Sequence, residues 1–393
     1  MPKMSVKDLP IKDKKIFLRV DFNVPLDEEQ NITDDTRIKE SLPTIQYIID
    51  NGGIPIIASH LGRPKGKFDP RQSLKPAAKR LGELLKREVK FAPDCVGTEV
   101  KKMVDDLKPG DVLLLENLRF HPEEEKNDPN FAKELASLAE IYINDAFGAA
   151  HRAHASVEAI THYFESPACG FLMEKELRYL EGALKNPQRP LLAIIGGAKV
   201  STKIGVLKNL VDKVDNLVIG GGMCFTFYKA NGLGIGRSLC EDDFLTEAKQ
   251  LLNNPKIYLP VDVVIATDIK NTTPVKNVDI KSIPADHYGV DIGEKSTGQI
   301  ADLIKNAKTI VWNGPMGIFE IDAYAKGTEA VARAIADVTT KGAISIVGGG
   351  DSVAALEKFN LKSSISHVST GGGASLEYLE GKELPGLRVL KDK

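Results

Sequence analysis

The sequence predicts an α/β protein with two doubly wound, mostly parallel sheets, joined by a hinge helix. Short apolar runs alternate with helical patterns along the whole chain, as in sheets whose faces are covered by helices. A proline-flanked break at residues 185–190 divides this alternation into two halves. The length of 393 residues allows two or three domains, each with its own core.

The composition excludes several classes of protein. Charged residues make up 27% of the chain and hydrophobic residues 42%, and the net charge of −2 gives no overall field that favours nucleic acid or an anionic membrane. The four cysteines are scattered without a C-x-x-C pair, which argues against a zinc site or a disulfide framework and for a reducing compartment. The first residues lack the apolar core of a signal peptide, and no apolar run is long enough to span a membrane. We therefore expect a cytoplasmic protein in which any anion site is a local basic cluster.

Four strands are predicted in the first half, and polar residues follow each of them. The strands are expected at residues 15–25, 54–58, 111–115 and 140–145, with helical patterns between them. Because ligands bind at the carboxyl ends of parallel strands, the side chains at those ends are the candidates for a site. The cations found there are Arg37, His60, Arg63, Arg119, His151, Arg152 and His154.

This set of cations predicts a site for a polyanion. Four arginines on one edge would repel one another without a bound anion, and the planar guanidinium suits carboxylate and phosphate oxygens. Arg37 also stands at the start of a predicted helix, where a cation opposes the helix dipole and costs folding free energy. One alternative is that some arginines pair with Asp21, Asp145 or Glu116. Another is that the two histidines flanking Arg152 bind zinc together with Asp145, which the nearby arginine disfavours.

A connecting helix is predicted at residues 171–184, immediately before the proline-flanked break. We therefore expect a first domain at residues 1–170, a connecting helix and hinge at 171–188, and a second domain from residue 189.

The second half opens on an apolar strand at residues 191–195 that runs into two glycines. Ser201 and Thr202 are candidate N-caps of the helix that follows, and Lys199 and Lys203 lie four residues apart near its start. A helix start with free N–H groups and two ammonium groups is a site for an anion such as phosphate. The alternative is an ordinary glycine turn beside solvated lysines. No P-loop motif occurs anywhere in the chain.

The same strand-then-glycine pattern recurs through the second half. Five strands end in glycine clusters, at residues 191–195, 216–219, 309–313, 343–347 and 367–370. Five such clusters on one edge would form a floor of backbone N–H groups for a phosphorylated ligand. None of them contains the G-x-G-x-x-G fingerprint of dinucleotide-binding proteins.

Two acidic residues complete the predicted site of the second half. Asp351 follows three glycines and is a candidate ligand for Mg²⁺. Glu320 is either a contact for ribose hydroxyls or an ordinary surface acid.

The two halves together indicate phosphoryl transfer between an anionic substrate and a Mg-nucleotide. Such transfer is mostly positioning and charge stabilisation. No general base is evident, and an acceptor that is already an anion, such as a carboxylate, needs none. A two-domain nicotinamide-dependent dehydrogenase is the alternative, which the missing fingerprint disfavours. A binding protein without catalysis is a third option, which the combination of a basic edge with Asp351 disfavours.

Eight motifs resemble those of phosphoglycerate kinase and follow the order of that family from end to end of the chain. In the first half they are RVDFNVP (19–25), SHLGRP (59–64), ENLRF (116–120) and NDAFGAAHRAH (144–154). In the second half they are GGAKV (196–200), NGPMG (313–317), GGGD (348–351) and STGGGAS (369–375). The compact length is typical of bacterial members.

The resemblance implies reversible phosphoryl transfer from 1,3-bisphosphoglycerate to MgADP, giving 3-phosphoglycerate and MgATP in glycolysis, by an enzyme that acts as a monomer. The phosphoglycerate would be bound by Asp21, Asn23, Arg37, His60, Leu61, Gly62, Arg63, Arg119 and Arg152. The nucleotide would be bound by Gly197, Lys199, Lys203, Gly220, Gly293, Asn313, Glu320, Gly349, Gly350, Asp351 and Ser352. The catalytic groups would be Arg37, Lys203, Gly372 and Gly373, and Asp351 would hold Mg²⁺.

The resemblance also implies two Rossmann-like domains around a hinge. The second domain would occupy residues 189–372, and residues 373–393 would return to the first domain. Ser352 stands where many members of the family have threonine, and it keeps the hydroxyl group.

Overall fold

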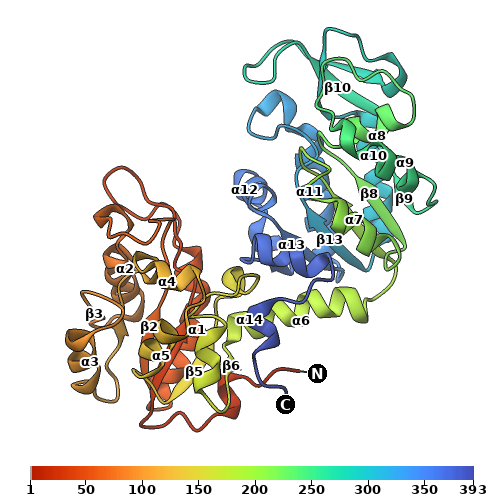
Figure 1. Ribbon diagram of the computed structural model, residues 1–393. Coiled ribbons are helices and arrows are strands. Elements are labelled where there is room, and N and C mark those ends of the chain that lie inside the picture. The colour runs from red at the N-terminus through yellow and green to blue at the C-terminus, as the bar shows by residue number, and fades with distance from the viewer. Residues whose placement is uncertain (1) are drawn as a thin grey trace. The chain divides into compact units, whose positions relative to one another are not determined.

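The computed structural model describes residues 2–393, and these fold into two compact units (Figure 1). The first unit contains the described residues up to Arg178 together with Glu383–Lys393, and the second contains Tyr179–Lys382. None of the helices in this part of the chain combines the length and the apolar character needed to cross a membrane.

The first unit is built on a six-stranded parallel sheet in the order β3-β4-β2-β1-β5-β6. Its strands are β1 (Lys15–Arg19), β2 (Ile54–Ala58), β3 (Lys90–Phe91), β4 (Leu113–Leu114), β5 (Ile141–Asn144) and β6 (Ala168–Cys169). The four predicted strands are present, and β2 has the predicted bounds. The two edge strands were not predicted, because two residues are too few to show an alternating pattern.

Helices cover this sheet and bury apolar stripes on it. They are α1 (Thr36–Asp50), α2 (Lys75–Leu85), α3 (Thr98–Asp105), α4 (Pro122–Glu125), α5 (Pro129–Ala136), the first half of α6 (Phe171–Lys185) and α14 (Pro385–Arg388). In α1, Ile38, Ile45 and Ile48 recur at helical spacing and are fully buried in the core of the first unit. Short 3-10 turns occupy Val6–Asp8, Pro70–Gln72, Leu118–Phe120, Phe147–Ala149 and Ala159–Tyr163.

The second unit also has a six-stranded parallel sheet, in the order β15-β14-β13-β7-β8-β9. Its strands are β7 (Leu191–Ile195), β8 (Asn216–Ile219), β9 (Ile257–Tyr258), β13 (Thr309–Asn313), β14 (Ile344–Gly348) and β15 (His367–Val368). The five strands predicted to end in glycines therefore lie side by side in one sheet. The predicted α/β class with two parallel sheets is confirmed.

A small antiparallel sheet in the second unit was not predicted. It has the order β11-β10-β12, formed by β10 (Asp262–Ala266), β11 (Lys276–Asp279) and β12 (Tyr288–Ile292). Strand β11 lies at an edge of this sheet and is mostly exposed. Its sequence, Lys-Asn-Val-Asp, carries no apolar signal.

The helices of the second unit surround its parallel sheet. They are the second half of α6, α7 (Ile204–Val211), α8 (Cys224–Ala230), α9 (Leu245–Leu252), α10 (Glu294–Asn306), α11 (Lys326–Thr340), α12 (Gly350–Lys358) and α13 (Gly373–Leu379). Short 3-10 turns occupy Asp242–Phe244, Ile280–Ser282, Asp322–Tyr324 and Lys362–Ser364. Trp312 on β13 is fully buried at the centre of this core.

Two local predictions were wrong. The strand expected at residues 15–25 ends at Arg19, because Asp21 instead accepts a hydrogen bond from the backbone N–H of Asn23 and turns the chain. Ser201 and Thr202 do not cap α7, which begins only at Ile204. The Ser201 hydroxyl donates to Glu241 and the Thr202 hydroxyl donates to the carbonyl of Lys199, so both are used outside the helix.

The C-terminal segment belongs to the first unit from Glu383 onward, whereas the family resemblance implies a return from residue 373. The N–H of Met4 donates to the carbonyl of Lys391, and the N–H of Lys393 donates to that of Pro2. Gly386 in α14 lies so close to Ala150 that a Cβ there would come within 2.9 Å of its backbone. The two chain ends are therefore joined through main-chain contacts in the first unit.

Candidate functional site

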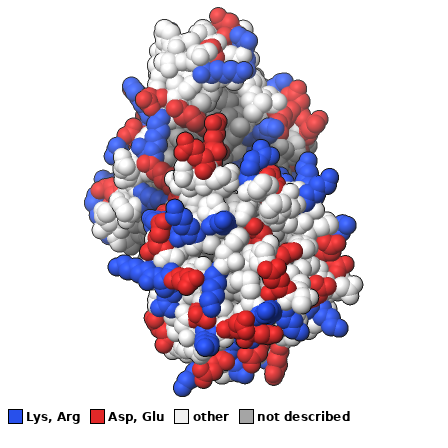
Figure 2. Space-filling model, turned by 90° about the vertical axis from the view of Figure 1, so that its left-hand side faces the viewer, with Lys and Arg blue, Asp and Glu red and all other residues white. Residues whose placement is uncertain are grey.

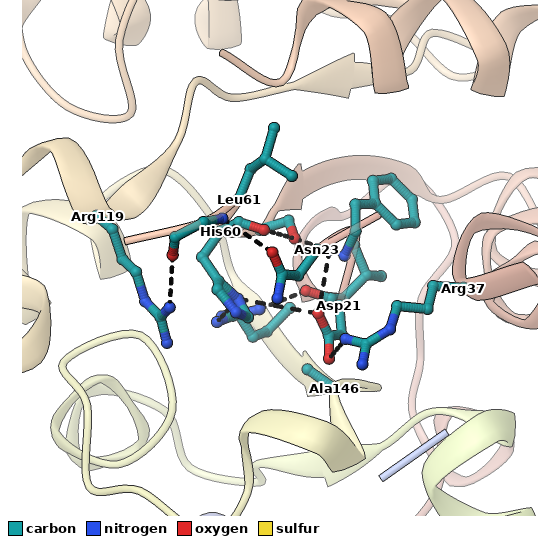
Figure 3. A network of polar contacts seen from close by, with 12 residues as sticks. Asp21, Asn23, Arg37, His60, Leu61, Arg119 and Ala146 are labelled. Carbon is teal, nitrogen blue, oxygen red and sulfur yellow. Dashed lines mark hydrogen bonds and ion pairs between the residues drawn. The ribbon is translucent and has the colours of Figure 1, made fainter. Parts of the chain in front are cut away.

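Side chains that follow β1 and β2, together with one from the start of α1 and one from the 3-10 turn Leu118–Phe120, meet at one edge of the first unit (Figure 3). We call this set, formed by Asp21, Arg37, His60 and Arg119, the anion edge. Asp21, His60 and Arg119 are buried, and the Arg37 side chain is 32% exposed. The predicted convergence of these residues is therefore seen in the structure.

The Asp21 carboxylate is the negative charge at this edge. It forms an ion pair with the Arg37 guanidinium, and the two groups point toward each other in Figure 3. Its other oxygen lies 4.0 Å from Nδ1 of His60. Burial by itself would raise the pKa of Asp21, but nearby positive charge, that of Arg37 foremost, holds the pKa at about 2.

Arg37 therefore pairs with Asp21, one of the acids considered from the sequence as possible partners of these arginines. Asp35, which precedes Arg37 at the start of the helix, instead pairs with Lys39 and Arg80. The ion pair with Asp21 offsets the unfavourable position of Arg37 at the start of α1.

His60 is neutral at pH 7. Burial lowers its pKa well below the ordinary value, and the arginines around it oppose the effect of Asp21. The same crowding affects its neighbours. Burial and nearby arginines lower the pKa of His154 to about 3 and that of Arg119 to about 10. Positive charge is thus concentrated at this edge beyond what its carboxylates balance.

Arg19 is a member of this cluster that sequence reasoning missed. Its side chain is fully buried, and its Nε donates to Ser156 Oγ at 2.8 Å while Nη2 lies 3.2 Å from Nδ1 of His60. Ser156 in turn donates through Oγ to the buried carboxylate of Glu124 at 2.6 Å. A charged residue as the last member of an apolar strand is the signal that could have identified it.

The backbone around Gly62 is held by two of the predicted substrate residues, Asn23 and Arg119. The Gly62 N–H donates to Asn23 Oδ1, and its carbonyl accepts from Nη1 of Arg119, both at 2.8 Å. Gly62 has φ of +63°, and a Cβ there would collide with Gln72. The N–H of Leu61 donates to Asn117 Oδ1 at 3.2 Å.

Two predicted cations lie apart from these contacts. Arg63 is exposed, and the half-buried Arg152 donates through Nε to His151. The alternative zinc site at Asp145, His151 and His154 has no support, because these three residues do not form a group of clustered donor atoms. Among residues 2–393, the one such group of three lies at another place in the first unit. Asp145 instead accepts from the N–H of Met173 at the start of α6.

The carboxyl edge of the second sheet is made mainly of backbone, as predicted. Its glycines allow strand ends to approach closely, since a Cβ on Gly196 would lie 2.2 Å from the carbonyl oxygen of Pro315. Lys203 is half-buried and donates to the side-chain carbonyl of Asn313. Burial lowers the pKa of Lys203 to about 8, against the attraction of Asp351. The ammonium group is therefore largely charged at pH 7 and short of anionic partners.

A cavity of about 430 Å³ lies beside this edge, within the usual range for small-molecule sites. Of the predicted nucleotide residues, Gly197, Glu320 and Asp351 line it. Its apolar wall, which the sequence did not reveal, is lined by Phe225, Tyr228, Leu239, Val263, Ile269, Tyr288 and Met316. An apolar wall beside glycines and carboxylates can hold a base and ribose next to phosphates.

The remaining predicted nucleotide residues occupy distinct positions. Gly293 precedes α10 and is packed against Asp262, which a Cβ at that position would strike, and it does not line the cavity. The hydroxyl of Ser352 accepts from the N–H of Gly314 at 2.6 Å. Gly220, Asn313, Gly349 and Gly350 follow or end strands of the same sheet.

Lys358 is a further residue that sequence reasoning missed. It lies on α12, the helix whose first turn carries Asp351, and donates to the carbonyl of Phe319 at 2.8 Å and pairs with Asp322 at 2.6 Å. It thereby fixes the loop that carries Glu320.

Charges on the face drawn in Figure 2 are mixed. Figure 2 shows Lys and Arg side chains interspersed with Asp and Glu over the face in view, in keeping with the net charge of −2. The anion edge is therefore a local feature.

Comparison with known proteins gives consistent results. A family model described as phosphoglycerate kinase matches residues 6–382. The chain is 56% identical over 397 residues to the phosphoglycerate kinase of Chlorobaculum tepidum and 57% identical over 397 residues to that of Chlorobium phaeobacteroides, with 100% of both chains covered in each case. The solved phosphoglycerate kinase of Coxiella burnetii superimposes with a TM-score of 0.90 at 43% identity, covering 99% of this chain and 98% of that chain. The Pyrococcus horikoshii structure gives 0.86 at 34% identity, covering 98% of each chain.

Replacing Arg37 by alanine is expected to destabilise the protein. The change leaves the buried Asp21 carboxylate without its ion-pair partner, and we expect a loss of about 1–3 kcal/mol, between the values for exposed and buried pairs. Because the folded-state pKa of Asp21 lies below its unfolded value, its contribution is present above about pH 4 and is lost as pH falls toward 2. Without Arg37 the pKa of Asp21 rises, so acid unfolding should begin at a higher pH.

Urea unfolding at pH 7 and acid titration followed by circular dichroism measure both effects. Arg80→Ala is the control, because Arg80 pairs with Asp35 near the same helix, and Asp35 is only partly buried whereas Asp21 is buried. Its loss should cost no more than about 1 kcal/mol. If Arg37→Ala is as stable as the wild type, the ion pair with Asp21 does not contribute to stability beyond offsetting the unfavourable position of Arg37 at the positive end of the helix dipole.

Proposed function

The chain belongs to the phosphoglycerate kinase family, and we propose that its first unit binds the phosphoglycerate and its second unit binds the Mg-nucleotide. The enzyme is a phosphotransferase that acts on a carboxyl group. One observation supports this assignment of a different substrate to each unit. The first unit has a buried cluster of cations, whereas the second has a sheet edge made of backbone and a cavity with an apolar wall.

The anion edge is suited to 3-phosphoglycerate because that ligand supplies the negative charge that the cluster lacks. Arginine forks bind carboxylate and phosphate oxygens through paired hydrogen bonds. We assign to this ligand Asp21, Asn23, Arg37, His60, Leu61, Gly62, Arg63, Arg119 and Arg152. The neutral imidazole of His60 can donate a hydrogen bond to the ligand without adding further charge repulsion to its arginine neighbours.

The second unit is suited to a nucleotide because its cavity joins an apolar wall to the glycine ends of the sheet. We propose that the wall holds the base, that Glu320 contacts the ribose, and that Lys199 and Lys203 bind phosphates. Burial disfavours the charged form of the Lys203 ammonium group, and a phosphate beside it would restore its full charge.

Asp351 fits a Mg²⁺ ion that is bound together with the nucleotide. It is exposed, lines the cavity, and lies in the first turn of α12. Mg²⁺ usually takes one or two carboxylates together with phosphate oxygens and several waters, which one open carboxylate allows. When bound, the ion would neutralise charge on the phosphate oxygens.

In the direction of ATP formation, the bond between phosphorus and the acyl oxygen of 1,3-bisphosphoglycerate breaks as a bond to the terminal oxygen of ADP forms. The leaving carboxylate needs no proton, so no general acid or base is required. Arg37 and Lys203 would stabilise charge on the transferring group. The N–H groups of Gly372 and Gly373, at the start of α13, would also face that group.

The dehydrogenase alternative has no support from the family match. We further propose that the protein acts as a monomer in the cytoplasm, where its four free cysteines would stay reduced. The functional domains proposed from sequence, 1–170 and 189–372 with the hinge at 171–188, stay a prediction.

Separate variation of the two substrates tests the division between the units. In a coupled assay with ATP and 3-phosphoglycerate, Arg119→Ala should raise the KM for 3-phosphoglycerate by about 10–100-fold, the value of a charge-assisted hydrogen bond, and leave the KM for ATP unchanged. Lys199→Ala should do the reverse. Equal changes in both KM values for either variant would overturn the division, and absence of wild-type activity would overturn the function.

The role of Asp351 is tested by its replacement with alanine. The variant should lose most activity while its free energy of unfolding stays within about 0.5 kcal/mol of wild type, as for other exposed sites. Glu357→Ala on the same helix is the control, since Glu357 pairs only with a surface lysine in the contacts seen here. Full activity of Asp351→Ala at low Mg²⁺ would show that Asp351 is not the Mg²⁺ ligand.

Arg37→Ala should lower kcat by about 10²–10³, the usual effect of removing one preorganised donor to developing charge. The KM for ATP should change little. Steady-state kinetics at a temperature where circular dichroism shows the variant folded make the measurement, with Arg80→Ala as the control. A kcat within about threefold of wild type would transfer the role to Lys203 or to another arginine.

A further inference from the structure

A group of metal-ligating side chains lies in the first unit outside the residues assigned to either substrate. Asp94 and Cys95 follow β3, and His121 follows the 3-10 turn Leu118–Phe120. Within the part of the chain that the structure describes, this is the only set of three His, Cys, Asp or Glu residues whose donor atoms all lie within 4.8 Å of one another.

The donor atoms are already arranged around a common point. Nε2 of His121 lies 2.7 Å from Oδ1 of Asp94, and the same oxygen accepts from the backbone N–H of Cys95 at 2.6 Å. On a tetrahedral zinc ion, oxygen, nitrogen and sulfur ligands lie about 3.4–3.7 Å apart, given the usual bond lengths. The three side chains therefore need only small rotations to take up one ion, which would replace the proton between Asp94 and His121.

The supporting contacts hold the ligands from separate elements. The His121 ring stacks on Phe131 of α5 with centroids 5.1 Å apart, and the backbone N–H of His121 donates to the carbonyl of Leu118. The carbonyl of Asp94 accepts from the N–H of Glu116 at 3.4 Å. Ligands fixed by their own surroundings lose little freedom when an ion binds.

The site is open on one side. The side chains of Asp94 and His121 are 47% and 28% exposed, which leaves room for entry and for a bound water, whereas Cys95 is buried behind them.

We propose that Asp94, Cys95 and His121 bind one thiophilic divalent cation of the zinc class, with water as the fourth ligand. One sulfur, one imidazole nitrogen and one carboxylate oxygen are the donors that such an ion takes in tetrahedral sites. The same donors do not suit Mg²⁺, which prefers oxygen ligands in octahedral geometry. The site is therefore distinct from that of the Mg-nucleotide, and it does not depend on the proposed function.

The alternative is that Asp94 and His121 form a surface ion pair and that Cys95 merely packs in the core. Titration of the full-length, nucleotide-free protein with Co²⁺ separates the two. Cobalt in a tetrahedral site with a thiolate gives intense visible bands and a sulfur-to-metal charge-transfer band in the near ultraviolet. The site predicts both, saturating at one equivalent of Co²⁺ and abolished by competing Zn²⁺.

Variants identify the ligands. Cys95→Ser should lose the charge-transfer band, and His121→Gln should weaken Co²⁺ binding by more than about 100-fold, the upper value for losing a residue that only orients a ligand. Cys240→Ser is the matched control. The Cys240 thiol also lies beside a carboxylate, that of Asp242 at 3.2 Å, but this pair includes no histidine. The Cys240→Ser variant should therefore leave the spectrum unchanged. Circular dichroism checks that each variant folds. If Cys95→Ser does not fold, the Co²⁺ affinity of His121→Gln is the deciding measurement.

Two results would overturn the proposal. One is the absence of a charge-transfer band in the wild type at excess Co²⁺. The other is a band that persists in Cys95→Ser, or in His121→Gln with unchanged affinity, or that is lost in Cys240→Ser.

Discussion

The ion pair between Asp21 and Arg37 is the interaction on which the anion edge depends. Asp21 is a buried carboxylate that stays ionised because cations surround it, and those cations tolerate their own burial partly because Asp21 is there. The balance is incomplete, since Arg19 and Arg119 are also buried at this edge. Glu124 reaches Arg19 through Ser156, and Arg119 is paired with the largely exposed Glu125 at 3.5 Å. A bound polyanion would complete it, and so the same electrostatic imbalance that limits stability provides binding free energy.

The two units meet the requirement for anion binding by different means. The first uses charged side chains on a sheet edge, held by hydrogen bonds such as that between Arg119 and the carbonyl of Gly62. The second uses mainly strand-end backbone, with glycines where chains approach each other closely and with Lys203 as a partly buried cation. Side-chain forks can distinguish carboxylate from phosphate oxygens by geometry, whereas a backbone edge can accept a chain of phosphates beside an apolar wall.

Much of this could be predicted from the sequence, and the exceptions have physical causes. Strands such as 54–58 and 191–195 are continuous apolar runs, so their bounds agree with the structure. The pairing of Arg37 with Asp21 could not be selected among several acids, because it depends on how a loop turns after β1. The N-caps at Ser201 and Thr202 were wrong because Glu241, distant in sequence, takes the Ser201 hydroxyl. The apolar wall of the cavity is assembled from segments that are far apart in the sequence, including strands β10 and β12 of the antiparallel sheet.

The central claim is that the anion edge lacks negative charge which a phosphorylated ligand supplies. Thermal unfolding of the wild type with 3-phosphoglycerate, and separately with glycerate at equal concentration, tests it most directly. A ligand that binds only the folded state at 100 times its Kd adds about 2.7 kcal/mol of stability. We expect 3-phosphoglycerate to raise the Tm, less so as salt is increased, and glycerate to have little effect. Equal shifts with both compounds, or none with 3-phosphoglycerate, would contradict the account.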